Sequence, residues 1–383
     1  MSEVAVVGVG QTAFTRSCGV TIKELCFEAF KEALEDCNLY PKEIEASLIC
    51  SAPEYDKQRS PAGAIVEYLG LNPQPTTYVE NICASGTTGV RLAYSLIKSG
   101  LHDIVAVIGF QKMSELTSRE AQERMGRGAD IMWDSPFGLT MPAGYALYAR
   151  MHMKTYGTTE EQMAEVKVKS SKYAVLNPKA MFQREVSLEE VLTSRVISSP
   201  LKFYDCSANA DGASCVILAS AEKARKITDT PVWIVGIGSA SEPLSMANRT
   251  SFVGLNCAVE AARQAYKMAG IEPKDVDVAE VHDCFTIAEI MAYENLGFCN
   301  PGEGGKLVQE GQTYIDGDFP VNIDGGLLGK GHPIGATGGS QVRTIVMQLR
   351  GDAGRLQVKR AEIGLVHNIG GIGLYGNVLI FRR

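Results

Sequence analysis

Four short motifs, far apart in the chain, carry side chains that could together transfer an acyl group. One motif supplies a cysteine and three supply histidines, at residues 81–86 (Asn-Ile-Cys-Ala-Ser-Gly), 282–285 (His-Asp-Cys-Phe), 331–338 (Gly-His-Pro-Ile-Gly-Ala-Thr-Gly) and 367–371 (His-Asn-Ile-Gly-Gly). A thiol that can pass its proton to an imidazole is the arrangement that forms thioester intermediates. The set therefore predicts acyl transfer through a cysteine.

Cys83 is the candidate nucleophile because of its place between two predicted elements. It follows an extended stretch at 76–79 and precedes a helical pattern that begins near Ser85. A helix N-terminus stabilises a thiolate, so we expect a lowered pKa for this thiol. The alternative is a buried structural cysteine, which we expect for the cysteines in apolar surroundings: Cys26, Cys37, Cys50 and Cys215.

The histidine motifs also lie where predicted strands end. His332 stands in a glycine-rich stretch at 325–338, which requires tight turns and close backbone approach, and a helix follows from about Gly338. His282 and Cys284 occupy a turn between a strand-like segment at 276–281 and a helix at 286–291. His367 ends a strand at 363–366, again before glycines. Each histidine alone could be structural, but four such sites at strand ends favour one joint active site.

Two glycine patterns resemble nucleotide-binding loops, and neither fits. Gly8-x-Gly10-x-x-Ala13 follows a strand, but the next helix begins only near Thr21, so its N-terminus is misplaced for a dinucleotide pyrophosphate. The glycines at 371, 373 and 376 precede a strand rather than a helix. We therefore expect no nicotinamide cofactor.

The elements that must position these residues occur twice. Glu28-Ala29, Ala33, Pro41-Lys42 and Ile44 recur at one constant offset along the chain as Glu260-Ala261, Ala265, Pro273-Lys274 and Val276. Upstream, residues 4–10 resemble residues 232–238. Each copy alternates strands and helices, which is typical of layered α/β folds. The sequence predicts two similar halves, residues 1–225 and 226–383.

A polar, charged segment interrupts the first half at about 114–200. We interpret it as an inserted loop domain that carries a lid or a binding wall. Arg124 and Arg127 could bind a substrate carboxylate or the phosphates of a ligand, or could be solvated helix charges, and Met141 precedes an Ala/Tyr/Met-rich helix. We take Met141, Arg124 and Arg127 as candidate substrate-binding residues.

Composition excludes several classes of function. The net charge is −7, so a nucleic-acid partner is not expected. No apolar run has membrane-spanning length, and from the two ends of the sequence we expect neither a secretory nor a peroxisomal signal. Its ten cysteines include no Cys-x-x-Cys pair, so we expect no metal site, and we expect a reducing, cytoplasmic compartment.

These motifs resemble those of the thiolase family, over the whole chain. The motif around His332 is highly specific, and His-Asp-Cys-Phe at 282–285 resembles the sterol-carrier-protein-type and archaeal-type branch. Common thiolases carry Cys-x-Gly near the C-terminus, where this chain has His367-Asn368-Ile369-Gly370. The resemblance implies a five-layered α/β/α/β/α fold and a homodimer or tetramer. It also makes a small zinc-ribbon/OB-fold protein a possible partner.

The resemblance also implies a reaction, which is reversible thiolysis of a 3-oxoacyl-CoA, with coenzyme A as a substrate and no cofactor. Cys83 would hold the acyl group and His332 would take its proton. Cys284 would exchange the α-proton, and His282 would stabilise the enolate oxygen through a water. Backbone N–H groups of Cys83 and of Ile369 or Gly370 would form an oxyanion hole, and His367 could help activate the thiol. The default substrate is acetoacetyl-CoA, with aromatic or dicarboxylic 3-oxoacyl-CoA as alternatives.

Three other functions remain open at this stage. The first is a ketoacyl-synthase-like condensing enzyme, which would need neither the glycine cage around His332 nor Cys284. The second is a retro-aldolase of the same superfamily, and the presence of both Cys83 and His332 argues against it. The third is an inactive scaffold subunit, which an intact catalytic set disfavours.

Overall fold

The structure, a computed structural model, describes residues 3–52 and 58–383. Its main sheet has nine strands in the order β3-β2-β4-β7-β1-β8-β11-β10-β9. The strands are β1 (Val4–Gln11), β2 (Ala46–Cys50), β3 (Thr76–Val79), β4 (Ile104–Gln111), β7 (Gly212–Ser220), β8 (Val232–Ser241), β9 (Val278–Glu280), β10 (Ile363–Gly370) and β11 (Tyr375–Arg382). Only two residue pairs join β1 to β8, at Ala5–Trp233 and Val6–Val232, so the sheet divides there into two halves.

The two halves follow one plan. The second half-sheet repeats the strand order of the first on the other side of the β1–β8 junction. In chain order, its strands β8, β9, β10 and β11 correspond to β1, β2, β4 and β7. Helix α1 (Ile22–Cys37) corresponds to α9 (Asn256–Ala269). The short turns that follow these helices, Pro41–Glu43 and Pro273–Asp275, keep the offset that the sequence shows.

Paired glycines explain part of this repetition. A Cβ on Gly10 would lie 2.1 Å from the carbonyl oxygen of Ala29, and one on Gly238 would lie 1.7 Å from that of Ala261. Glycine is therefore required where each helix crosses its own strand. The Gly8-x-Gly10 pattern therefore serves the packing of α1 on β1.

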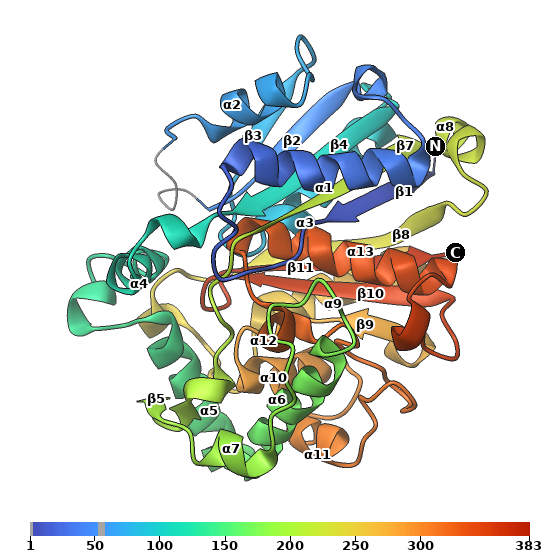
Figure 1. Cartoon of the computed structure of the whole chain (residues 1–383). Coiled ribbons are helices and arrows are strands. Elements are labelled where there is room, and N and C mark those ends of the chain that lie inside the picture. Colours follow the sequence, from blue (N-terminus) through green and yellow to red (C-terminus); the bar gives the residue numbers. More distant parts are fainter. Residues whose placement is uncertain (1–2, 53–57) are drawn as a thin grey trace.

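Alternating strand residues build five layers, as predicted. Ala5 and Val7 pack with α1 and α2 (Pro61–Tyr68), whereas Val4 and Val6 face a central layer. That layer contains α3 (Ser85–Lys98) and α13 (Thr337–Arg350), which lie between the half-sheets (Figure 1). Helices α9 and α10 (Thr286–Asn295) cover the remaining face.

The segment between β4 and β7 forms a helical subdomain beside the second half-sheet (Figure 1). It contains α4 (Ser118–Gly126), α5 (Met141–Tyr156), α6 (Glu160–Ala174), α7 (Leu188–Leu192), β5 (Val196–Ser198) and β6 (Leu201–Lys202). Three further helices complete the second half, α11 (Gly304–Gln309), α12 (Gly326–Lys330) and α13, while α8 (Ala221–Ile227) connects the halves. Within the described ranges, no helix is both long and apolar enough to cross a membrane.

Candidate active site

The predicted motifs meet in one place although they lie far apart along the chain. Cys83, His282, Cys284 and His332 all line a cavity of about 1010 Å³ between the half-sheets and the helical subdomain. Cys83 comes from the turn after β3, and the other three come from the second half. The cavity is thus assembled from both halves of the chain.

Cys83 and His332 form a hydrogen-bonded pair. The Cys83 Sγ lies 3.3 Å from the His332 Nε2. The other ring nitrogen of His332, Nδ1, lies 2.7 Å from the Thr337 hydroxyl, which itself donates to the Pro333 carbonyl. The Thr337 oxygen must therefore accept the Nδ1 proton. This leaves a lone pair on Nε2, so His332 is a base aimed at the thiol.

Burial sets the resting protonation of this pair. It raises the pKa of Cys83 to about 12, although a hydrogen bond from the Gly371 backbone favours the thiolate. Burial also lowers the pKa of His332 to about 4. The prediction of a lowered thiol pKa was wrong: Cys83 precedes the first turn of α3, whose N-cap is Ala84, and desolvation outweighs the helix N-terminus. At neutral pH the pair is a thiol beside a neutral imidazole.

His282 is held in the opposite orientation. Its Nδ1 lies 3.0 Å from the Asn368 amide nitrogen, and the Asn368 amide oxygen accepts from Thr87. The amide must then donate to Nδ1, so the proton of neutral His282 is on Nε2. Burial and the neighbouring His332 and His367 lower the pKa of His282. The site therefore offers one imidazole acceptor and one imidazole donor.

Cys284 is the second thiol of the cavity. Burial raises its pKa, and the Tyr145 hydroxyl hydrogen-bonds to it. The Tyr145 hydroxyl proton is donated to the Gly371 carbonyl at 3.3 Å, and the Tyr145 ring stacks on Phe285 with centroids 4.7 Å apart. Because its pKa is raised, Cys284 is a neutral thiol at neutral pH. It is 6% exposed and lines the cavity, so a substrate there can reach it.

The structure places the remaining candidates less directly. His367 lies inside β10, which continues to Gly370, and burial lowers its pKa to about 3. Neither of its ring nitrogens has a hydrogen-bond partner among the described residues. Ile369 and Gly370 do not line the cavity, whereas Gly371 does. Met141, Arg124 and Arg127 do line it, on the subdomain side.

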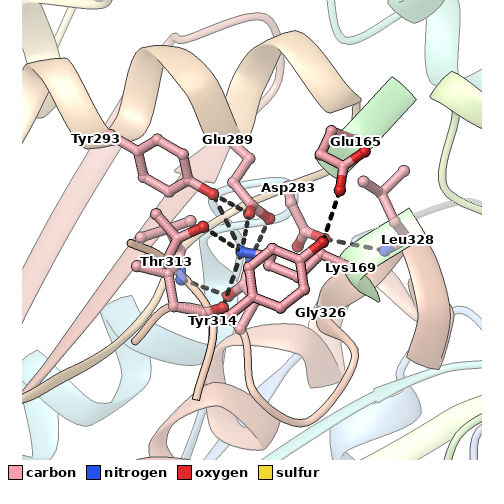
Figure 2. Close-up of polar contacts among 12 residues, drawn as sticks. Glu165, Lys169, Asp283, Glu289, Tyr293, Thr313, Tyr314, Gly326 and Leu328 are labelled. Carbon is pink, nitrogen blue, oxygen red and sulfur yellow. Dashed lines mark hydrogen bonds and ion pairs between the residues drawn. The ribbon is translucent and has the colours of Figure 1, made fainter. Parts of the chain in front are cut away.

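A buried charge network supports the His282–Cys284 turn from behind (Figure 2). Asp283 accepts backbone N–H groups of Leu327 and Leu328 at 2.7 and 3.1 Å. Burial raises the pKa of Asp283 to about 8, and the nearby Glu289 adds to the effect. Glu289 pairs with Lys169 at 2.5 Å, and both side chains are fully buried. The carboxyl between the two reactive residues is thus fixed to α12.

Sequence reasoning missed several of these contacts. Thr337 and Asn368 belong to the motifs quoted above. They could have been identified from the sequence as candidate hydrogen-bond partners that orient the histidine rings. Tyr145 is one aromatic residue in an ordinary helical pattern, and no local signal distinguishes it. The atoms of Cys83, His282 and His332 lie within 4.8 Å of one another, a set that could also hold a metal ion. The expectation of no metal site rested on cysteine spacing and on the reaction that the family resemblance implies.

Comparison with known proteins agrees with the geometry. The profile described as "Thiolase, N-terminal domain" matches residues 4–222, and "Thiolase C-terminal domain-like" matches 238–383. An acetyl-CoA acetyltransferase of Methanothermobacter thermautotrophicus is 43% identical, covering 100% of both chains. Sterol carrier protein 2 of Bos taurus is 37% identical over 96% of this chain and 70% of its own. The solved structure titled "Ltp2-ChsH2(DUF35) aldolase" is 26% identical with a TM-score of 0.86, covering 98% and 97% of the two chains.

Proposed function

The chain belongs to the thiolase family, and from this membership and the site geometry we propose that it cleaves a 3-oxoacyl-CoA reversibly through an acyl group on Cys83. It is an acyltransferase that acts on CoA thioesters, in the branch of the archaeal and sterol-carrier-protein thiolases. Acetoacetyl-CoA is the simplest 3-oxoacyl-CoA with which to test the reaction. The observation that carries the proposal is the 3.3 Å contact between the Cys83 Sγ and a His332 Nε2 that can only accept.

The first half of the reaction forms the acyl-enzyme. The Cys83 sulfur attacks the 3-keto carbon while the His332 Nε2 takes its proton. The bond between the α-carbon and the 3-keto carbon breaks, and the enolate of acetyl-CoA leaves. Cys284 protonates the enolate carbon, and the Nε2–H of His282 stabilises the enolate oxygen before protonation.

The second half returns every group to its starting state. The Cys284 thiolate accepts the proton of an incoming CoA thiol, whose sulfur attacks the acyl carbon. The developing oxyanion would be stabilised by the Cys83 N–H, as predicted, and by the Gly371 N–H in place of Ile369 or Gly370, because Gly371 interacts with the Cys83 sulfur. Cys83 leaves and recovers its proton from His332. In this scheme Cys284 and His332 carry the proton transfers. His367 is proposed only to help activate Cys83, and the reaction does not depend on it.

Replacement of Cys83 tests this function. Acetoacetyl-CoA and CoA should yield acetyl-CoA with the parent protein, and acetyl-CoA alone should add one acetyl mass to Cys83. The Cys83→Ala protein should lose both signals, while Cys26→Ala, at a buried cysteine of α1, should keep both. Undiminished thiolysis by Cys83→Ala would refute the mechanism.

Retro-aldol cleavage is a second candidate, favoured by the likeness to a structure titled as an aldolase. Such a reaction needs a base but no cysteine nucleophile. A 3-hydroxyacyl-CoA cleaved equally by the parent and by Cys83→Ala would support it. CoA-dependent cleavage that disappears in Cys83→Ala would favour thiolysis, and would also argue against a ketoacyl-synthase-like condensation or an inactive scaffold.

We also propose two kinds of protein partner. The solved relative is titled with a DUF35 protein, which supports a protein partner for this chain, and we propose that this partner is the small zinc-ribbon/OB-fold protein that the family resemblance implies. A second copy is the other partner, because β3 is an edge strand whose first three residues are exposed. Co-expression with the DUF35-type protein, followed by light scattering of each sample, should give a hetero-complex built on a dimer.

A further inference from the structure

Lys167 is a buried cation in the wall of the active-site cavity. It belongs to α6, is 4% exposed and lines the same cavity as Cys83 and His332. Its Nζ donates to the Leu328 carbonyl at 2.7 Å. An ammonium has three N–H donors, and among the described residues this carbonyl is its one hydrogen-bond acceptor. Two donors therefore remain without an acceptor in a buried place.

The neighbouring carboxylates do not complete its bonding. Asp283 and Asp205 are close enough to favour the charged form of Lys167. However, the oxygens of Asp283 accept from α12, and those of Asp205 accept from Thr286 and the Lys202 backbone. Burial, the largest effect, lowers the pKa of Lys167 to about 8, and Arg184 acts in the same direction. An additional carboxylate would stabilise this ammonium.

Lys169, two residues along the same helix, shows what a satisfied lysine looks like here. Its Nζ contacts Glu289, the Tyr293 hydroxyl, the Thr313 hydroxyl and the Val321 carbonyl (Figure 2), and it does not line the cavity. Lys167 instead lies by the rings of Phe182 and Tyr204, with Nζ 5.1 and 5.8 Å from their centroids. Both of these aromatic residues also line the cavity.

We propose that Lys167 binds a carboxylate on the acyl part of the substrate, so that the site selects 3-oxoacyl-CoA thioesters that carry a second acid group. The proposal rests on the thiolase function proposed above and names its substrate class. A carbon chain fits the apolar wall, and its carboxylate supplies the acceptors that the ammonium lacks. The phosphates of CoA do not need Lys167, since the exposed Arg195 and the Glu190-paired Arg184 also line the cavity.

Matched substrates test the proposal. The probes are 3-oxoadipyl-CoA and 3-oxohexanoyl-CoA, which share six acyl carbons and differ in a terminal carboxylate against a methyl. The parent should prefer the carboxylated substrate in kcat/KM by about 10- to 100-fold, the range for a hydrogen-bonded charge pair. Lys167→Met should abolish that preference. Lys172→Met, an exposed lysine of the same helix, should retain it.

Binding separates this proposal from the proposed function. Succinyl-CoA, butyryl-CoA and CoA alone can be titrated calorimetrically into Cys83→Ala, which cannot turn over. Tighter binding of succinyl-CoA that disappears with Lys167→Met supports the carboxylate site even if thiolysis fails. Equal binding of the two acyl-CoA thioesters would overturn it. So would a loss of CoA affinity in Lys167→Met, which would assign the lysine to a phosphate, or equal kcat/KM losses on both substrates, which would make it structural.

Discussion

Replacement of His332 by Asn should convert acylation of Cys83 into a strongly pH-dependent reaction. Asn keeps much of the size of the ring but cannot take the thiol proton. Because the pKa of Cys83 is about 12, about one thiol in 10⁵ is ionised at pH 7 without help. The variant must rely on that fraction, which rises tenfold with each pH unit. The parent uses His332 at every turnover instead.

The magnitude follows from these two groups. Loss of a general base typically costs about 10²–10⁴-fold, and we expect this loss at pH 7. From pH 7 to 9 the variant should recover about 100-fold, since its thiol titrates only near pH 12. The parent should be nearly independent of pH over that range. Its acid limb should fall near pH 4, where His332 becomes protonated, and not near the ordinary histidine pKa of about 6.5.

The assay is the rate at which acetyl-CoA adds one acetyl mass to Cys83, measured by rapid quench and mass spectrometry. His102→Asn, on the loop before β4, is the matched control and should behave as the parent does. An acylation rate for His332→Asn within a few-fold of the parent at pH 7 would refute the role of His332. A parent half-inactivated near pH 6.5 would refute the protonation states assigned here.

The other predictions concern three buried groups. Cys284→Ala should still accept an acetyl group on Cys83. It should exchange the α-protons of acetyl-CoA with deuterated solvent about 10²–10⁴-fold more slowly, as followed by NMR, and exchange at the normal rate would assign the base to another residue. Lys169→Met leaves Glu289 uncompensated and should lower the free energy of unfolding by about 3–5 kcal/mol in urea, whereas the exposed Lys31→Met should cost under about 1 kcal/mol. The pKa of His367 is about 3 in the folded protein and near 6.5 in the unfolded chain, so the free energy of unfolding falls as pH falls through that window. Between pH 6.5 and 4.5, the free energy of unfolding of His367→Leu, measured in urea, should fall by about 2–3 kcal/mol less than that of the parent. Equal decreases would contradict this.

The fold was predictable because the sequence contains an internal repeat, so the same order of strands and helices can be recognised in both halves. The constant offset between the two copies, as from Pro41 to Pro273, holds in the structure, and the α/β layers follow from strands whose alternate residues face different helices. Cys83 and His282 were found from their places at strand-to-helix turns, whereas His332, which lies between α12 and α13, was found from the glycines around it. Local sequence carried these features, so one sequence sufficed to find them.

The environment of the site was not predictable in the same way. The pKa of Cys83 depends on how deeply the subdomain and the second half bury its sulfur, and no neighbouring residue records that depth. Lys167 is one of several lysines in α6, and its position against the cavity is set only when α6 packs on α12. Both quantities arise from long-range packing.

The division of the reactive groups between the halves has a consequence for refolding. Cys83 reaches His332, and Thr87 reaches Asn368, across most of the length of the chain. We expect each half to form its own strands and helices before these atoms meet. After dilution from denaturant, circular dichroism should therefore recover before the capacity to become acylated. The delay between the two signals then measures the time that one half needs to dock on the other. Acylation of Cys83 thus reports the last step of folding.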